Sequence, residues 1–308
     1  MNGLNIVVAG GAGFIGSHVT SYLHSLGANL TVLDNCSTGR IDWLPDDVSF
    51  IEVDLTDFES CMEAFSEEDE LVLHFAADSE VNRSGGRTQF DENTSITQNI
   101  LEAMRTYDNT RLGFTSSSTV YGQAPRPTHE TFGPLEPISV YGASKVADEA
   151  LCSAYANLYN FEASVFRFAN IVGPRLRNAV IPDFIDKLQT NPNRLEILGD
   201  GRQEKSYMHV TDCIKAMEVV LEKTNSTYDV FNIGTNTTTT VIEIADIVCE
   251  ELEVDPKYEF TGGTQGWMGD VTRMQLSSEK LEELGWKPEF ESNEAIRRTT
   301  QSLINEMV

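Results

Sequence analysis

Near its beginning the chain reads Leu4-Asn5-Ile6-Val7-Val8-Ala9-Gly10-Gly11-Ala12-Gly13-Phe14-Ile15-Gly16. An apolar run comes first, and glycines then recur at positions 10, 13 and 16. A glycine-rich turn between a strand and a helix lets the backbone approach a pyrophosphate closely, and the N-terminus of the helix attracts that anion. This stretch therefore predicts a dinucleotide site at the first strand–helix turn.

An acidic residue stands where the second strand is expected to end. Asp34 follows Gly16 by 18 residues, close to the spacing of a carboxylate that binds a ribose 2′-hydroxyl. The structural alternative is a plain turn followed by a surface aspartate. A carboxylate repels a 2′-phosphate, and the only nearby cation in the sequence is Arg40. We therefore predict NAD as the cofactor rather than NADP.

Strand-like apolar runs alternate with helical patterns through the first half of the chain, which is typical of a parallel sheet covered by helices. The predicted strands are Leu4–Ala9, Leu30–Leu33, Ser49–Val53, Leu71–Phe75, Arg111–Ser116 and Ala163–Phe168. The predicted helices lie near Phe14–Leu26, Asp57–Phe65, Gln89–Tyr107 and Val140–Leu158. We expect an α/β fold, a doubly wound parallel sheet (Rossmann) with a smaller α+β C-terminal substrate domain.

The pattern becomes irregular after Pro174. Further helices are predicted at Val180–Gln189, Asp212–Leu221, Val241–Leu252 and Ser278–Leu284, and further strands at Leu195–Leu198, Tyr228–Ile233 and Lys257–Phe260. The segment Gln123–Pro137 holds four of the ten prolines and predicts a long ordered loop, either a functional lid or a rigid connector. We assign residues 1–170, with about 207–234, to an NAD-binding domain, and residues 171–206 and 235–308 to a substrate-binding domain.

Composition argues against several classes of protein. The 308 residues include 48 acidic and 22 basic side chains, and the net charge of −26 would repel the phosphates of a nucleic acid. No apolar run is long enough for a membrane span, and the first residues do not resemble a secretory signal. The five cysteines and five histidines are scattered, so we expect no disulfide framework, no metal site and a cytoplasmic location.

Tyr141 and Lys145 are four residues apart in a predicted helix and would share one face of it. A cation beside the phenol would lower its pKa from about 10 toward neutrality, so that Tyr141 could act as a general base. The hydroxyl residues Thr115-Ser116-Ser117-Ser118 lie at the end of a predicted strand, 24 residues before Tyr141 when counted from Ser117, and a hydroxyl there could reach the same oxygen. The structural alternatives are a solvated pair on a helix face and an ordinary turn at the end of a strand.

Other motifs accompany these residues in a specific order. They are Leu33-Asp34-Asn35, Val53-Asp54-Leu55, His74-Phe75-Ala76-Ala77, Asn93, Val120-Tyr121-Gly122, Arg167-Phe168-Ala169-Asn170, Gly173-Pro174-Arg175 and Gly199-Asp200-Gly201. Over nearly its whole length the chain resembles the extended short-chain dehydrogenase/reductases of the NAD-dependent sugar-nucleotide epimerase/dehydratase family, most closely the UDP-glucose 4-epimerase-like members. The resemblance implies a nucleotide-sugar substrate, no membrane partner and a homodimer.

The resemblance also implies roles for individual residues. It places the cofactor against Gly10, Gly13, Phe14, Ile15, Gly16, Asp34, Asn35, Ser37, Thr38, Asp54, Leu55, Ala76, Ala77, Asn93, Tyr141, Lys145 and Phe168. It makes Tyr141, Lys145 and Ser117 catalytic, and it places the substrate against Ser117, Ser118, Asn170, Lys205 and Arg202. Asn170 could instead be a satisfied turn residue, and His209 is expected to be structural. Glu80, Asn82 and Arg83 either face the site or form a solvated loop.

The implied reaction is epimerisation of a nucleotide-activated hexose at C4 through a transient 4-keto sugar. Related 4,6-dehydratases usually carry an Asp-Glu pair directly after the catalytic hydroxyl, and Ser118 and Thr119 occupy those positions here. Neither hydroxyl can perform the proton transfer that elimination of water requires, which disfavours a dehydratase. Decarboxylase, C2-epimerase and reductase chemistry, and a non-catalytic NAD-binding sensor, are the alternatives.

Two positions depart from the family pattern for binding the diphosphate. Lys205 stands where an arginine is common, and Trp267 and Met268 stand where another arginine precedes Gly269-Asp270. An ammonium is a point charge without the planar fork that binds phosphate in a bidentate manner. Arg175, Arg202 or Arg273 could supply the missing charge, and the identity of the nucleoside stays open.

The acidic composition leads to a hypothesis about salt. If the surface is adapted to a salty interior, salt screens the repulsion between its carboxylates, and we expect activity to hold or rise as KCl approaches molar concentrations. The measurement is the initial rate of nucleotide-sugar conversion across a KCl series. A steady loss of activity toward molar KCl would contradict the hypothesis.

Overall fold

The computed structural model describes residues 1–80 and 86–307, and the chain divides into two structural units. The first unit comprises Met1–Val120, Val140–Arg167 and Met217–Phe231. The second comprises Tyr121–Ser139, Phe168–Ala216 and Asn232–Val308. The proline-rich segment predicted as a loop therefore belongs to the second unit, although the sequence-based division had placed it in the cofactor domain. We describe each unit by itself.

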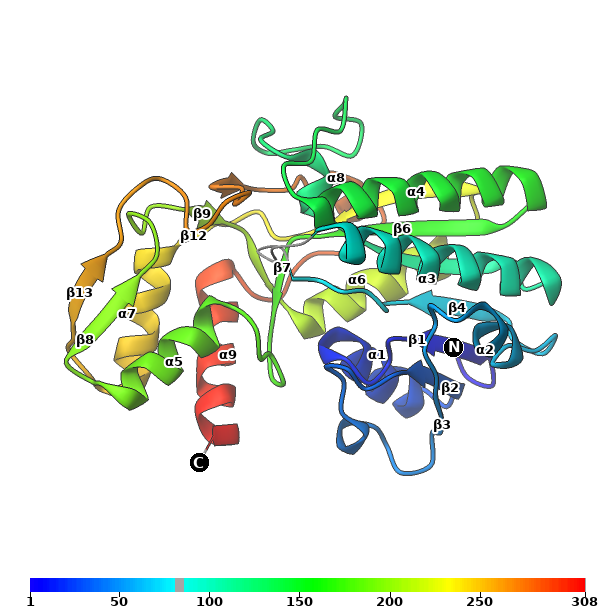
Figure 1. Ribbon diagram of the computed structural model, residues 1–308, viewed down its shortest axis with the longest axis horizontal. Helices are drawn as coiled ribbons and strands as arrows, with labels where there is room; N and C mark the ends of the chain where they lie inside the picture. Colours follow the sequence, from blue (N-terminus) through cyan, green and yellow to red (C-terminus); the bar gives the residue numbers. More distant parts are fainter. Residues whose placement is uncertain (81–85, 308) are drawn as a thin grey trace. The chain divides into compact units, whose positions relative to one another are not determined.

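A seven-stranded sheet in the order β11-β6-β5-β4-β1-β2-β3 organises the first unit (Figure 1). Its strands are β1 (Asn5–Ala9), β2 (Asn29–Asp34), β3 (Ser49–Glu52), β4 (Leu71–His74), β5 (Arg111–Ser117), β6 (Glu162–Phe168) and β11 (Tyr228–Ile233). The pairs β1–β2, β1–β4, β2–β3 and β4–β5 are parallel. The predicted doubly wound sheet is confirmed, and its strand order reverses between β1 and β4.

Helices cover both faces of this sheet. They are α1 (Phe14–Ser25), α2 (Phe58–Glu63), α3 (Gly86–Thr106), α4 (Val140–Tyr159) and α6 (Val210–Lys223). Figure 1 shows α3 and α4 running side by side. On the other face, the Tyr22 hydroxyl of α1 donates to Glu218 of α6 at 2.6 Å.

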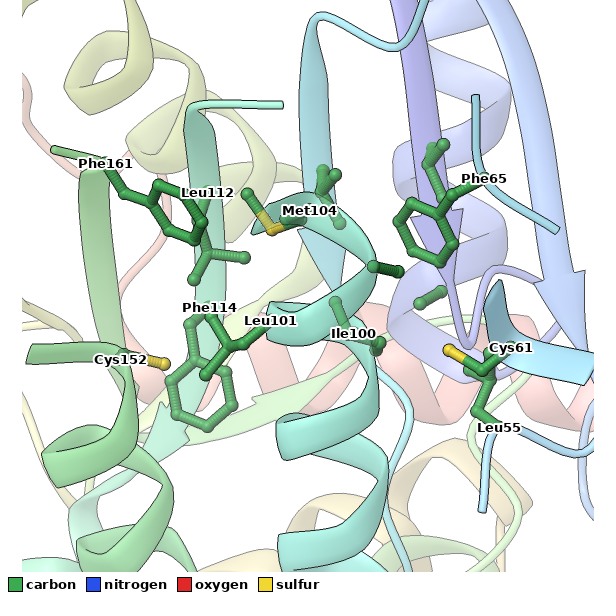
Figure 2. Packing of buried hydrophobic residues seen from close by; sticks show 14 of the residues in the cluster. Leu55, Cys61, Phe65, Ile100, Leu101, Met104, Leu112, Phe114, Cys152 and Phe161 are labelled. Carbon is green, nitrogen blue, oxygen red and sulfur yellow. The ribbon is translucent and has the colours of Figure 1, made fainter. Parts of the chain in front are cut away.

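A buried hydrophobic cluster joins α2, α3 and α4 to one face of the sheet (Figure 2). Alternate residues of β1, Val7 and Ala9, point into this cluster, as expected for a strand buried on both faces. From the helices and from β5 come Ile100, Leu101, Met104, Cys152 and Phe114. Each large side chain in such a cluster stabilises the fold by roughly 1.5–3 kcal/mol.

The second unit contains small sheets and helices. Its strands are β7 (Asn170–Val172), β8 (Arg194–Ile197), β9 (Glu204–Lys205), β10 (Tyr207–His209), β12 (Thr239–Thr240), β13 (Lys257–Phe260) and β14 (Arg273–Met274). Its helices are α5 (Val180–Thr190), α7 (Val241–Leu252), α8 (Glu279–Glu283) and α9 (Ser292–Met307). None of the helices in the described part of the chain is both long and apolar enough to cross a membrane.

The sequence analysis did not predict α9. Polar residues occupy its buried face, because Thr299 and Thr300 are fully buried beside Ala295 and Ile296. Each threonine hydroxyl donates to the backbone carbonyl four residues earlier, at 2.7 and 2.9 Å. The hydroxyls are thus satisfied inside the helix. A pattern based on apolar side chains therefore missed a helix that buries threonines.

The turn after β1 is packed too tightly for side chains. A Cβ atom at Gly16 would lie 2.2 Å from the carbonyl oxygen of Gly10 and 2.8 Å from the Cα atom of Gly11. Both neighbours are backbone atoms, so no side-chain rotation relieves the clash. Gly16 is therefore required for α1 to begin directly against the end of β1.

We expect Gly16→Ala to lower the free energy of unfolding by roughly 1–3 kcal/mol, because the added methyl group overpacks the turn. Gly133→Ala is the matched control, since a Cβ atom there meets no heavy atom within 4 Å. The control should change stability by no more than about 0.5 kcal/mol. Urea unfolding followed by tryptophan fluorescence measures both, and equal stabilities for the two variants would refute the packing argument.

Candidate active site

The glycine-rich turn lies where the sheet reverses its strand order, which is where open α/β sheets bind ligands. Gly10 has φ +76°, and a Cβ atom on it would lie 2.5 Å from the backbone nitrogen of Ala76. The backbones after β1 and β4 therefore approach each other closely. Gly13 caps α1 without a side-chain hydrogen bond, so no side chain covers the first N–H groups from the cap position. Backbone and helix terminus together form a cradle that fits a pyrophosphate.

Asp34 connects this turn to the end of β2. Its carboxylate accepts hydrogen bonds from the backbone N–H of Ala12 at 3.0 Å and of Cys36 at 2.8 Å. A carboxylate can accept more than two hydrogen bonds, so capacity for a ribose hydroxyl remains. The guanidinium of Arg40 is paired with Asp42 at 3.0 and 2.9 Å. That pairing offsets the charge of Arg40, which could otherwise favour a 2′-phosphate.

The other residues expected around the adenosine form local turns. Asn35 accepts the backbone N–H of Ser37 at 3.0 Å, and both Ser37 and Thr38 are exposed. Asp54 is exposed and accepts two hydrogen bonds from Thr56, whereas the side chain of Leu55 is buried in the core cluster. The side chain of Leu55 is therefore a core residue and is not exposed to a ligand.

The Asn93 side chain holds the backbone that follows β4 through hydrogen bonds. Its amide oxygen accepts the N–H of Asp78 at 2.8 Å, and its nitrogen donates to the Asp78 carbonyl and to the Ser144 hydroxyl, both at 3.1 Å. Gln89 donates to the carbonyls of Asp78 and Glu80 from the same helix. Asn93 was expected on the cofactor side, and here it joins α3, α4 and the loop after Ala77. Asn82 and Arg83 lie outside the described residues.

Ser117 and Tyr141 form a hydroxyl–phenol pair. The Ser117 oxygen accepts hydrogen bonds from the backbone N–H of Thr119 at 3.2 Å and from its hydroxyl at 3.0 Å. With its lone pairs occupied, Ser117 has its own hydrogen left to donate to Tyr141, and this hydrogen bond lowers the pKa of the phenol. Ser118 is buried at the start of the short 3-10 turn Ser118–Tyr121.

The pKa of Tyr141 is nevertheless raised, which corrects the expectation that its neighbourhood lowers it. Part of Tyr141 remains exposed, yet burial around its hydroxyl is the largest influence, and the charges of Asp148 and Asp78 raise the pKa further. Lys145 lies in the same first turns of α4 and is 2% exposed. Its ammonium lies 3.9 Å from the Asp148 carboxylate and 4.7 Å from the centre of the Phe114 ring.

Four of the predicted residues lie in the second unit. Phe168 is buried at the end of β6, and the Asn170 amide donates to the Ser206 carbonyl at 3.1 Å, so that part of Asn170 is already satisfied. Lys205 pairs with Asp270 at 2.6 Å, with its nitrogen 5.1 Å from the Trp267 ring centre. Arg202 is exposed. Lys205 is thus neutralised locally, which its sequence neighbours did not reveal.

Known proteins resemble this chain over most of its length. The model of the NAD dependent epimerase/dehydratase family matches residues 6–234. A putative UDP-glucose 4-epimerase of Methanocaldococcus jannaschii is 34% identical over 307 residues, covering 97% of this chain and 98% of its own. A dTDP-D-glucose 4,6-dehydratase of Homo sapiens is 30% identical over 315 residues, covering 96% and 89%.

Solved structures resemble the chain over the same length. A crystal structure of a UDP-galactose 4-epimerase superposes with a TM-score of 0.91 and 39% identity, covering 99% of this chain and 100% of that one. The family expected from the motifs is therefore confirmed, while epimerases and dehydratases both occur among the relatives. The chain belongs to the NAD-dependent epimerase/dehydratase family, and NAD is its cofactor.

Proposed function

We propose that this protein epimerises a nucleotide-activated hexose at C4, of the UDP-glucose/UDP-galactose type, through a transient 4-keto sugar. The observation that carries the proposal is the pairing of Ser117 with Tyr141, with the Lys145 ammonium on the same helix. The positions after Ser117 hold no acid. The relatives named as UDP-glucose and UDP-galactose 4-epimerases support this choice of reaction.

In this reaction Tyr141 takes the proton of the C4 hydroxyl, and Ser117 turns its single hydrogen from Tyr141 to the sugar oxygen as this oxygen becomes that of a ketone. When bound, NAD in its oxidised form supplies a hydride acceptor and a positive charge that favours an ionised phenol. Lys145 adds a second positive charge. Both charges oppose the burial that raises the pKa of Tyr141.

The cradle fits the cofactor through this chain's own residues. Gly10, Gly13 and Gly16 would leave room for the pyrophosphate, and Asp34 would accept a ribose hydroxyl. Expected neighbours of the remaining parts are Phe14, Ile15, Asn35, Ser37, Thr38, Asp54, Leu55, Ala76, Ala77, Tyr141, Lys145 and Phe168. The close approach of Gly10 to Ala76 is the structural reason why no larger residue suits the turn.

The residues after Ser117 favour epimerisation over elimination of water. Thr119 donates two hydrogen bonds to the Ser117 oxygen, and neither Thr119 nor Ser118 carries a carboxyl group. A hydroxyl at these positions cannot serve as the acid or base for loss of water from the sugar. The similarity to dehydratases then reflects the oxidation step that both reactions share.

Recognition of the substrate diphosphate is assigned to the second unit. Asn170, Lys205 and Arg202 are the proposed contacts, with Ser117 and Ser118 on the sugar. Because Lys205 already neutralises Asp270, it brings little net charge to a diphosphate. Arg202 has no side-chain partner in the part of the chain that the structure describes. We therefore propose that Arg202 attracts the diphosphate more strongly than Lys205 does.

We also propose a cytoplasmic homodimer. The exposed end of α4 carries the apolar side chains of Leu158 and Tyr159, and α3 lies beside it. Such a helix pair can pack against its copy. The reasoning is by analogy with the family, and size-exclusion chromatography with light scattering measures the assembly.

The reaction is tested with purified protein, NAD and a panel of nucleotide hexoses. We expect interconversion of UDP-glucose and UDP-galactose, followed by sugar NMR. Tyr141→Phe removes the proton acceptor and should lower kcat by roughly 10²–10⁴-fold.

Tyr107→Phe is the control, because Tyr107 lies among the partly buried side chains that pack on the core cluster and has no proposed role in catalysis. Epimer formation by Tyr141→Phe at a near-normal rate would refute the assignment of the base. Release of water or carbon dioxide from the sugar by the wild-type protein would refute the reaction itself.

Cofactor preference is tested at Asp34. We expect Asp34→Asn to weaken NAD binding by about tenfold, since a charge-assisted hydrogen bond is worth about 1.5–3 kcal/mol. We also expect the ratio of NAD affinity to NADP affinity to fall in this variant. Cofactor binding is measured by calorimetry with each dinucleotide. Asp47→Asn, which removes a surface partner of His24, is the control and should change neither affinity. An unchanged ratio of NAD to NADP affinity in Asp34→Asn would show that Asp34 does not select the cofactor.

A further inference from the structure

Asp148 is a fully buried carboxylate on α4, one turn after Lys145. Neither of its oxygens has a hydrogen-bond partner of ordinary geometry within residues 1–80 and 86–307. Burial raises the pKa of Asp148 to about 6, and the charge of Lys145 and the Thr97 hydroxyl, which also contacts His74 Nε2 at 3.1 Å, oppose that rise. The Lys145 nitrogen lies 3.9 Å from Asp148. The sequence analysis and the proposed mechanism give this carboxylate no role.

Two opposite charges are therefore buried together. An isolated ammonium or carboxylate in an apolar interior tends to lose its charge, because the cost of leaving water is several kcal/mol per ion. Lys145 is 2% exposed, and its nitrogen lies over the face of Phe114. Such a lysine stays charged only if a neighbouring group compensates the loss of hydration.

The titratable neighbours of Lys145 can be compared one by one. His74 of β4 is buried, and burial and the charge of Lys145 lower its pKa, so it stays neutral. On α4 the neighbours are Tyr141, Asp148, Glu149 and Cys152, and burial raises the pKa of the cysteine. Asp78 acts on Tyr141 rather than on the lysine.

Glu149 is already balanced by another cation. Arg167 donates to its two oxygens at 2.9 and 2.6 Å, and the Ser116 hydroxyl donates at 2.5 Å. This leaves Asp148 as the counter-charge of Lys145 in the described part of the chain.

We propose that Asp148 is a positioning residue for the reaction, whose buried carboxylate keeps the Lys145 ammonium charged and in place for Tyr141. The inference rests on the proposed roles of Tyr141 and Lys145. Its chemistry is that of a fixed counter-ion, and no proton or bond has to move for it to act. Asp148 touches neither the phenol nor a reacting atom in this assignment, and it acts through Lys145.

Removal of the Asp148 charge should shift the pH dependence of the reaction in a definite direction. Burial lowers the pKa of Lys145, and Asp148 is the largest influence that opposes this. Asp148→Asn keeps the shape of the side chain and removes its charge, so the ammonium should be lost at a lower pH. The same change lowers the pKa of Tyr141, which Asp148 now raises. Both limbs of the pH–rate profile should therefore move to lower pH in this variant.

The direct test is the titration of Lys145 by NMR in the NAD-loaded protein with lysine labelled at the ε carbon. The chain has eight lysines, and Lys145→Arg identifies the signal. We expect Lys145 to remain protonated at about pH 8 in the wild type and to titrate at least about one pH unit lower in Asp148→Asn. Equal titration in the two proteins, with both folded by circular dichroism, would overturn the proposal.

The pH–rate profile of Asp148→Asn supplies the second readout. If Asp148 had only a structural role, its replacement would lower the stability of the protein without moving both limbs of the profile. Asp183→Asn is the matched control, since Asp183 pairs with Lys187 at 2.8 Å on the exposed side of α5, and it should leave the profile unchanged. If Asp148→Asn does not fold, the titration of Lys145 in the wild-type protein tests the proposal by itself. A Lys145 side chain that is already neutral at pH 7 would refute the proposal. Absence of turnover with every hexose would instead count against the proposed function, because the NMR titration does not require activity.

Discussion

Charged side chains lie in the interior between α4 and the sheet, and each is accompanied by an opposite charge. Arg167 is paired with Glu149, and Lys145 lies beside Asp148. The desolvation of these ions is compensated only while both partners of each pair are present. The positions of the catalytic candidates depend on this balance, because Ser116, which precedes Ser117, donates to Glu149, and Lys145 follows Tyr141 on the same helix.

The balance of charge also determines the protonation of the phenol. Burial and two carboxylates raise the pKa of Tyr141, whereas the Ser117 hydrogen bond lowers it. The surroundings of Tyr141 in this chain therefore favour its neutral form. A positive charge that arrives with the oxidised cofactor favours the phenolate, which couples the basicity of the tyrosine to cofactor binding.

Membership of an epimerase/dehydratase family leaves the outcome of the reaction to a few side chains. Oxidation at C4 needs a proton acceptor and a hydride acceptor, and elimination of water additionally requires an acid and a base. Ser118 and Thr119 cannot supply these, and Thr119 instead holds Ser117. In the second unit, Lys205 and Asp270 neutralise each other.

Local features of the sequence were sufficient to predict much of the fold and the general location of the cofactor site. The spacing of Gly10, Gly13 and Gly16, the acid at Asp34 and the alternation of strands and helices are properties of short segments, so they predicted the Rossmann sheet and NAD. The Tyr141–Lys145 spacing likewise follows from one helix. The tertiary structure decided what surrounds these residues. It brought Asp148 to Lys145, fastened the loop after Ala77 with Asn93, paired Lys205 with Asp270 and buried the threonines of α9. Burial and charge pairing depend on which distant segments meet, so the pKa of Tyr141 and the neutralisation of Lys205 could not be inferred from residue spacing alone.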